Sequence, residues 1–329
     1  MSQIQTQFIK NVLAGTETQL SEKGSAFAPA NIALSKYWGK RNAELNLPAT
    51  SSLSVSLGDL GTKTEIRVAA EDSVFLNGEA MGSETLFYKR TVDFLKLFPM
   101  VGAHFEVRTQ NSIPTAAGLA SSASGFAALV LALNDLAGWG LGRRMLSLIA
   151  RLGSGSAARS VYSGFVQWYA GTDDDGSDSY AERIDAEWPE LRVGILEVSN
   201  VHKPVGSREG MNRTVATSEL YNSWPAQADA DLEAIRLSIR EKDFPMLGKT
   251  AEHNALSMHA TMLAAWPPLI YLQPESLEII HTVQRLRGEG LELFLTIDAG
   301  PNIKLLFLES VASDVIAAFP DLRIIQPFG

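Results

Sequence analysis

Residues 114–125 read PTAAGLASSASG and lead directly into an apolar helical run, ASGFAALVLALNDLAG. A loop of Gly, Ala and Ser at the start of a helix lets backbone N–H groups approach a phosphate closely. Small residues also permit close helix packing, and composition alone favours neither interpretation. The segment matches neither the GxxxxGK[ST] loop nor the GxGxxG fingerprint, so the usual NTPase and dinucleotide-binding folds lose support.

Strand-like and helical patterns alternate on both sides of this loop, which predicts an α+β fold. Short β-type runs are expected at 52–57 and 62–70, divided by Gly58 and Gly61, and Asn77-Gly78 predicts a hairpin turn. A strand is expected at 104–109 and again at 191–199. Helices are expected over 84–98, 143–152, 208–223, 228–241, 244–264 and 275–288, and the runs LELFLTI and IKLLFLE predict two strands before a terminal helix.

The length of 329 residues predicts two domains, because one hydrophobic core usually stops growing below this size. The strand pattern restarts at 191, which places the boundary near 190. The expected division is an N-terminal extension over 1–25, an N-terminal domain over 26–190 and a C-terminal domain over 191–329. The polar segment 1–24 has only a short amphipathic stretch, so a flexible or peripheral extension is expected.

Charge and composition exclude several kinds of partner. Acidic residues outnumber basic ones, 37 against 28, so the net charge of −9 offers no attraction to nucleic acid. The absence of cysteine excludes disulfides, thiolate zinc sites and a thiol nucleophile, and the five histidines show no ligand spacing. No run is long and apolar enough for a membrane span, which predicts a cytoplasmic protein without a membrane partner. A phosphorylated small molecule remains compatible, because a few basic residues can still line one pocket.

Three further segments carry candidate functional residues. PANIALSKYWGKRNAELNLPATSSLSVSL (29–57) places Lys36 and Lys40 beside Tyr37 and Trp38, which suits phosphate binding in a cleft or an exposed basic turn over packed aromatics. GSGSAARS (153–160) carries Arg159, whose guanidinium suits a carboxylate or a phosphate. TIDAGPN (296–302) delivers Asp298 at the end of a strand, where it is either a rigidly held carboxylate or a turn former.

In this order, PANIALSKYWGKR, SSLSVSL, PTAAGLASSASG, GSGSAARS and DAGPN resemble the mevalonate diphosphate decarboxylases of the GHMP kinase superfamily, from about residue 26 onward. The resemblance implies a two-lobed fold with the active site in the cleft between the lobes. It implies ATP-dependent decarboxylation of mevalonate 5-diphosphate through phosphorylation of its 3-hydroxyl, with magnesium, in a protein that is commonly a homodimer.

Two alternatives stay open at this point. In the first, the protein is a relative of the same branch that acts on the monophosphate or stops after phosphorylating the 3-hydroxyl. In the second, it is a GHMP-type fold without catalysis that serves as a binding module, although the intact phosphate loop and Asp298 argue against that alternative.

The resemblance also implies roles for individual residues. Asp298 faces the reacting hydroxyl, Lys36 balances its charge, and Arg159 holds the substrate carboxylate. The remaining substrate contacts are expected at Tyr37, Lys40, Ser154, Ser156, Ser207 and Arg208. The nucleotide is expected at Pro114, Ala117, Gly118, Leu119, Ser121 and Ser122, with Ser122 nearest the magnesium ion. Ala158 stands where many relatives carry cysteine. His202, His253 and His259 match no role and are expected in packing or at the surface.

Overall fold

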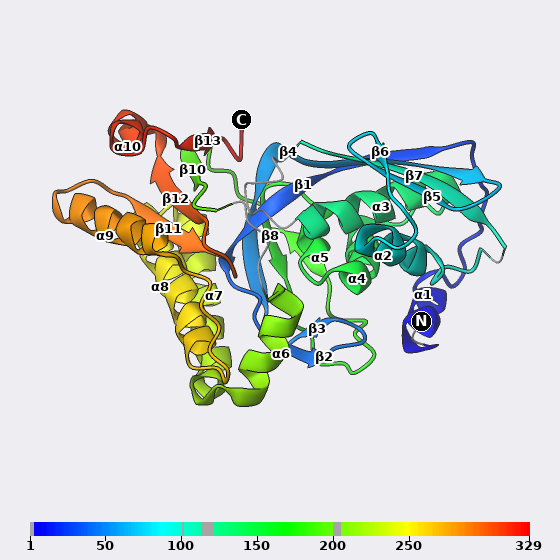
Figure 1. Ribbon diagram of the computed structural model, residues 1–329, viewed down its shortest axis with the longest axis horizontal. Coiled ribbons are helices and arrows are strands. Elements are labelled where there is room, and N and C mark those ends of the chain that lie inside the picture. The colour runs from blue at the N-terminus through cyan, green and yellow to red at the C-terminus, as the bar shows by residue number, and fades with distance from the viewer. Residues whose placement is uncertain (1–2, 101, 113–120, 200–204) are drawn as a thin grey trace.

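The computed structural model describes residues 3–100, 102–112, 121–199 and 205–329. Figure 1 shows an N-terminal half, blue to green, beside a C-terminal half, yellow-green to red. The N-terminal half contains α1 (Gln3–Val12), β1 (Gly24–Ser35), β2 (Lys40–Asn42), β3 (Leu47–Pro48), β4 (Ser52–Ala69), β5 (Ser73–Leu76), β6 (Glu79–Ala80), α2 (Leu86–Leu95), β7 (His104–Asn111), α3 (Ser121–Ala137), α4 (Arg143–Gly153), α5 (Ala157–Ser160), β8 (Phe165–Trp168) and β9 (Ala181–Arg183). The C-terminal half contains β10 (Leu191–Leu196), α6 (Ser207–Thr217), η2 (Glu219–Ser223), α7 (Trp224–Glu241), α8 (Phe244–Leu263), α9 (Pro274–Gly288), β11 (Phe294–Ile297), β12 (Ile303–Leu308), η3 (Glu309–Val311), α10 (Ala312–Ala318) and β13 (Arg323–Ile325).

The N-terminal sheet follows the order β6-β5-β7-β4-β8-β9, with β1 also paired to β4. Helices α2 to α5 cover one side of it, and α3 packs against both β1 and β4 (Figure 1). The predicted turn at Asn77-Gly78 is confirmed, since both residues have positive φ angles, 51° and 89°, as a type I′ hairpin turn requires.

Strand β4 is longer than the sequence pattern predicts. The runs 52–57 and 62–70 form one continuous strand of 18 residues instead of two, so the expected division at Gly58 and Gly61 was wrong. The glycines do not end the strand, because β1 continues beside it on both sides of them. The first part of β4 pairs with β8 and the second part with β7. Both β1 and β4 therefore extend from one half of the molecule into the other (Figure 1).

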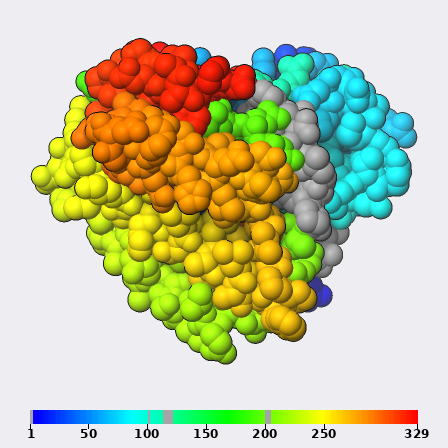
Figure 2. Space-filling model, turned by 60° about the vertical axis from the view of Figure 1, so that its left-hand side comes forward, coloured from blue at the N-terminus to red at the C-terminus, as the bar shows by residue number. Residues whose placement is uncertain are grey.

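The C-terminal sheet follows the order β11-β12-β10-β13 and is buried on both faces. On one face Phe294 and Leu306 pack with helices α7 and α8 and with strand β1. On the other face Leu295 and Phe307 pack with α9 and α10. Figure 2 shows α8 to α10 together with the end of the chain as one broad face of the molecule, from yellow to red.

Two element predictions in this half need correction. The chain does not end in a helix, because α10 is followed by the short strand β13, which completes the sheet beside β10. The helix expected over 208–223 ends at Thr217, and a separate 3-10 turn leads into α7, where Pro225 occupies the first turn.

The N-terminal segment is not a flexible or peripheral extension, as its polar composition had suggested. Helix α1 buries Phe8 and Ile9 in the core of the N-terminal half. The Gln5 side chain donates to the carbonyl of Glu44 at 2.7 Å, and the Arg151 guanidinium lies over the Phe8 ring. The few apolar residues of α1 lie on one side of the helix, and this side packs against the core. The polar composition of the whole segment gives no indication of that packing.

None of the helices in the described ranges has the length and apolar character needed to cross a lipid bilayer.

Candidate active site

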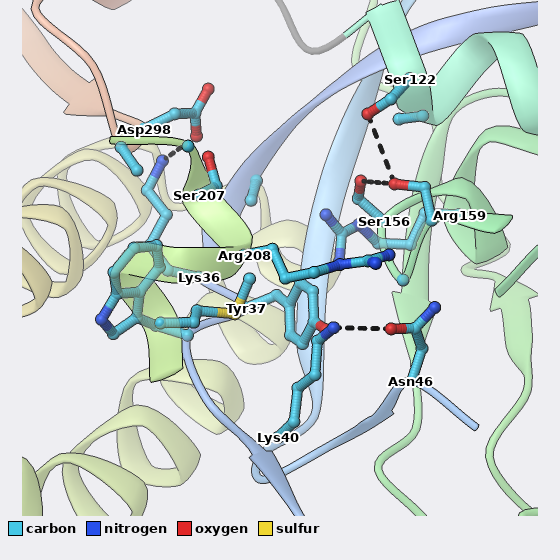
Figure 3. Close-up of a pocket in the computed structure, with 18 of the residues that line it drawn as sticks. Lys36, Tyr37, Lys40, Asn46, Ser122, Ser156, Arg159, Ser207, Arg208 and Asp298 are labelled. Atoms are coloured by element: carbon cyan, nitrogen blue, oxygen red, sulfur yellow. Dashed lines mark hydrogen bonds and ion pairs between the residues drawn. The ribbon is translucent and has the colours of Figure 1, made fainter. Parts of the chain in front are cut away.

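A cavity of about 490 Å³ lies between the two halves and is lined by residues from segments far apart in the sequence. The ten predicted site residues whose side chains are described all line it: Lys36, Tyr37, Lys40, Ser122, Ser154, Ser156, Arg159, Ser207, Arg208 and Asp298. In Figure 3 the labelled residues form three groups, with Lys36, Asp298 and Ser207 on one side, Ser122, Ser156 and Arg159 opposite, and Tyr37 and Lys40 below. Arg208 extends across the space between them.

Pro114, Ala117, Gly118, Leu119 and the side chain of Ser121 lie outside the described residues. Their predicted contact with a nucleotide stays a prediction. The backbone of Ser121 begins α3, so the predicted loop does lead into a helix whose first turn, at Ser122 and Ala123, lines the cavity.

Asp298 and Lys36 form an ion pair at the wall of the cavity. Strand β1 ends at Ser35 and delivers Lys36, whose Nζ lies 2.8 Å from Oδ1 of Asp298. The Lys36 side chain is 2% exposed, whereas 35% of the Asp298 side chain is open. Burial lowers the pKa of Lys36 to about 8 against the opposing effect of Asp298. Burial would raise the pKa of Asp298, but the ammonium groups of Lys36 and Lys304 outweigh it and hold this pKa well below its usual value. The carboxylate is ionised at neutral pH.

The backbone at both members of this pair is fixed by buried side chains. The Lys36 N–H donates to Asn254 Oδ1 at 2.8 Å, and Asn254 in turn donates to Asp231. The carbonyl of Asp298 accepts from His259 Nε2 at 3.0 Å, which requires the tautomer with the proton on Nε2. Burial lowers the pKa of His259 to about 4, so this histidine is neutral near pH 7. The expectation of a packing role for His259 was therefore incomplete, because it orients the turn that carries Asp298.

Arg159 presents a buried positive charge without a carboxylate at ion-pair distance among the described residues. Its guanidinium donates to Ser52 Oγ and to Asn31 Oδ1. Burial lowers its pKa to about 10, partly offset by the nearby Asp298, so the group remains charged at neutral pH. A buried cation whose only partners are neutral acceptors destabilises the fold, because no counter-ion compensates its charge. An anionic ligand would reduce this free-energy cost.

Three cations gather at another part of the cavity. Lys40 Nζ donates to Asn46 Oδ1 at 2.6 Å, and Arg90 donates to the carbonyl of Gly153 at 3.1 Å. Within the described ranges no carboxylate reaches ion-pair distance of Lys40, Arg90 or Arg208. Burial lowers the pKa of Lys40 to about 8, and the charges of Arg208 and Arg90 add to that effect. Three close cations without a counter-ion make a site for a multiply charged anion.

The segment between Lys36 and Lys40 is buried and not the exposed basic turn that was its alternative reading. Trp38 is 2% exposed, and its carbonyl accepts hydrogen bonds from Tyr221 and Trp224. At Gly39 the φ angle is 109°, and a Cβ atom would lie 1.8 Å from the Tyr221 hydroxyl, so only glycine fits. This close approach lets the chain reverse and direct Lys40 into the cavity.

Tyr37 and the serines complete the polar wall. The Tyr37 hydroxyl is buried and has no hydrogen-bond partner among the described residues, and burial raises the pKa of Tyr37. It is thus a neutral donor that a ligand can use. Ser154 Oγ lies 3.4 Å from Ser122 Oγ and 3.5 Å from Ser156 Oγ. Ser207 is the first residue of α6, whose N-cap is Gly206.

Sequence reasoning missed four polar residues at or beside this cavity: Asn31, Asn46, Arg90 and Lys304. Asn31 stands in the quoted motif, and its position in a buried strand was the available signal. Arg90 lies on a helix whose pattern gives no sign of a pocket. Lys304 is 1% exposed and lies 3.2 Å from Asp298 Oδ2; a lysine within the apolar run IKLLFLE was a signal that went unused.

The comparisons with known proteins agree with this geometry. Residues 28–181 match the family model "Diphosphomevalonate decarboxylase-like N-terminal domain", and residues 193–325 match "Mevalonate 5-diphosphate decarboxylase C-terminal domain". The diphosphomevalonate decarboxylase of Saccharomyces cerevisiae is 40% identical over 319 residues, covering 89% of this chain and 80% of that protein. The human diphosphomevalonate decarboxylase is 39% identical, covering 88% of this chain and 78% of that protein.

Solved structures agree as well. One described as "MDDEF in complex with MVAPP, AMPPCP and Magnesium" superposes with a TM-score of 0.87 at 40% identity, covering 92% of this chain and 96% of that chain. Mevalonate diphosphate decarboxylase from Staphylococcus aureus superposes with a TM-score of 0.87 at 35% identity, covering 93% and 95%. These matches confirm the resemblance read from the motifs and the mixed helix and sheet fold, and this chain belongs to the diphosphomevalonate decarboxylase family.

Proposed function

We propose that this protein converts mevalonate 5-diphosphate and ATP into isopentenyl diphosphate, ADP, phosphate and carbon dioxide. The observation that carries the proposal is the convergence of three charged groups on one cavity: the Asp298–Lys36 pair, the unpaired guanidinium of Arg159 and the cations around Lys40. The substrate has matching parts, namely a hydroxyl, a carboxylate and a diphosphate. A relative solved with MVAPP, AMPPCP and magnesium supports the same assignment.

In the first step the oxygen of the 3-hydroxyl attacks the γ-phosphorus of ATP, ADP leaves, and the hydroxyl proton passes to an oxygen of the transferred phosphoryl group or to water. Asp298 accepts a hydrogen bond from this hydroxyl and orients it, while Lys36 neutralises charge on the transferring phosphoryl group. A carboxylate whose pKa is held so low is a weak proton acceptor, so its environment favours orientation over proton removal.

In the second step the bond between C3 and the phosphate oxygen breaks, and phosphate carries away the electron pair. The carboxylate loses carbon dioxide, and its bonding electrons form the new double bond. Arg159 holds the carboxylate by a charge-assisted contact, which keeps the breaking C–C bond aligned with the leaving group. Ser154 and Ser156, beside Arg159, supply hydroxyl contacts to the same end of the substrate.

The diphosphate is bound by Lys40, Arg90 and Arg208, with the Tyr37 hydroxyl as a neutral donor. A diphosphate carries more negative charge than a monophosphate and therefore uses three cations more fully. Ser207, at the start of the helix that carries Arg208, lies beside Asp298 and Lys36 in Figure 3 and contributes a hydroxyl contact to the substrate there.

ATP binds at the start of α3 and in the preceding loop, with Ser122 nearest to magnesium. The described residues contain no group of three or more His, Cys, Asp or Glu side chains able to hold a metal alone. A single hydroxyl oxygen from Ser122 fits magnesium, because this ion is usually held by one or two protein oxygens together with substrate phosphates. When bound, magnesium neutralises charge on the nucleotide phosphates. A homodimer and a cytoplasmic location remain part of this proposal.

The decisive assay incubates the protein with mevalonate 5-diphosphate, ATP and magnesium and follows ADP, phosphate, carbon dioxide and the alkene. We expect all four to form in equal amounts. Parallel reactions with the 5-monophosphate and with mevalonate test the related activities. ADP without carbon dioxide would indicate a 3-kinase, preference for the monophosphate would indicate a phosphomevalonate decarboxylase, and binding without ADP formation would indicate a non-catalytic module.

A further inference from the structure

Asp298 contacts a second lysine that the mechanism above does not use. Lys36 Nζ lies 2.8 Å from Oδ1, and Lys304 Nζ lies 3.2 Å from Oδ2. The two ammonium groups come from opposite halves of the chain, one from the end of β1 and one from the second residue of β12. Each oxygen of the carboxylate therefore has its own cation.

The two lysines differ in their access to the cavity. Lys36 and Asp298 line it, but Lys304 is not among the described residues that do. Lys304 stands inside the C-terminal sheet, opposite Thr296 on β11 and Ile195 on β10, and is 1% exposed. Lys304 also donates to the carbonyl of Asn302 at 3.3 Å. It is held behind the carboxylate, away from any substrate.

Lys304 changes the charge balance around Asp298. With Lys36 alone, an interaction between Lys36 and the transferring phosphoryl group would leave Asp298 as an uncompensated charge in a partly buried place, which is strongly unfavourable. With Lys304 present, Asp298 keeps one cation at all times. The site then has one ammonium group more than it has carboxylates, and that surplus is available to the phosphoryl group.

Resting on the function proposed above, we propose that Lys304 is the permanent counter-ion of Asp298, a positioning residue that keeps this carboxylate fixed while Lys36 serves the phosphoryl group. The competing explanation is that Lys304 only closes the turn 298–302 through its bond to the Asn302 carbonyl. The two explanations differ in their dependence on Asp298. If Lys304 acts through Asp298, removing Lys304 costs nothing further once the carboxylate is gone, whereas a turn closure would be lost in either background.

The experiment compares Lys304→Met with Lys304→Arg and with a matched control, Arg192→Met. Arg192 is also a buried cation of the same sheet, but its partner is Glu309, away from the cavity. We expect Lys304→Met to lower kcat roughly 10–100-fold, as is typical when a residue that orients a functional group is lost. The dissociation constant for ATP should hardly change, Lys304→Arg should recover much of kcat, and Arg192→Met should affect thermal stability alone.

The pH profile tests the charge that Lys304 places beside Lys36. The charged groups facing Lys36 are Asp298, Lys304 and Arg159, and Lys304 is one of the charges that lower the pKa of Lys36. Saturating substrate keeps Lys40 protonated, so the alkaline limb of kcat reports Lys36. In Lys304→Met this limb should move to higher pH, by roughly one unit. An unchanged kcat and an unchanged limb would overturn the proposal.

A second comparison covers the case in which Lys304→Met folds poorly because Asp298 has lost one of its two cations. The double variant Asp298→Asn with Lys304→Met removes both charges. Because Lys304 is proposed to act through Asp298, this variant should have the residual turnover of Asp298→Asn alone. A further loss of similar size to that in the unmodified background would overturn the proposal. Failure of the function itself is separate, since the unmodified protein would then form no ADP or carbon dioxide.

Discussion

Lys36 Nζ and Asp298 Oδ1 lie 2.8 Å apart although 262 positions separate the two residues in the chain. The contact joins the end of a strand in the N-terminal half to a turn in the C-terminal half. An ion pair that closes only in the complete fold gives the cavity a charged wall, and its two members are open to separate tests.

Replacing Asp298 with asparagine should lower kcat by roughly 10²–10⁴-fold, because the amide keeps the shape of the side chain but loses its charge. Dissociation constants for ATP and for the phosphorylated acid should stay within a few fold, and circular dichroism should show an unchanged fold. Near-normal turnover of Asp298→Asn would remove this residue from the mechanism.

Replacing Arg159 with alanine should impair carbon dioxide release more than nucleotide binding, because the guanidinium is assigned to the substrate carboxylate. Arg159→Lys should recover little, since a single ammonium cannot reproduce the planar fork held by Ser52 and Asn31. The measurement is the ratio of carbon dioxide to ADP beside the ATP dissociation constant. Equal losses in both quantities would contradict the assignment.

Replacing Arg90 with leucine should raise the KM for the diphosphate substrate by roughly 10–100-fold, the value of one charge-assisted hydrogen bond. The effect on a monophosphate should be smaller, and higher salt should reduce the difference. Arg41→Leu is the matched control, because Arg41 lies beside Lys40 in sequence but pairs with Asp174 and is not one of the described cavity residues. A similar KM change in both variants would exclude a specific role for Arg90.

Replacing His259 with glutamine should make the protein less sensitive to mild acid. Burial lowers the pKa of His259 from 6.5 to about 4. In the unfolded chain His259 is protonated below about pH 6.5, whereas in the folded protein it stays neutral down to about pH 4. The free energy of unfolding therefore falls as the pH drops from 6.5 to about 4. The loss amounts to about 3 kcal/mol, and His259→Gln should lack it. Urea unfolding at several pH values measures the difference, and parallel curves for both proteins would refute this account.

The sequence was sufficient where one motif contains both the backbone geometry and the functional group. DAGPN placed Asp298 at a strand end, and GSGSAARS placed Arg159 beside serines, without knowledge of the fold. It was insufficient where a residue matters through its neighbours in space. Lys304 in an apolar strand, Arg90 on an amphipathic helix and His259 have roles that depend on elements which sequence patterns do not bring together.

The wrong predictions about the fold have a similar cause. Gly58 and Gly61 are strand breakers by local preference, but β4 continues because β1 pairs with it on both sides of a register shift at this point. The polarity of residues 1–24 conceals Phe8 and Ile9, whose burial depends on a core built by later segments. Tertiary contacts decided both outcomes, and no local pattern could report them.

The long strands β1 and β4 have a consequence for how the molecule unfolds. Ala28 and Ile66 belong to the apolar core of the N-terminal half, whereas Ile32 and Leu53, on the same two strands, belong to a core completed by α7 and α8. A chain cut near residue 190 would leave the second of these cores open to water. The molecule is therefore one cooperative unit despite its two lobes, and heating should melt both lobes in a single transition.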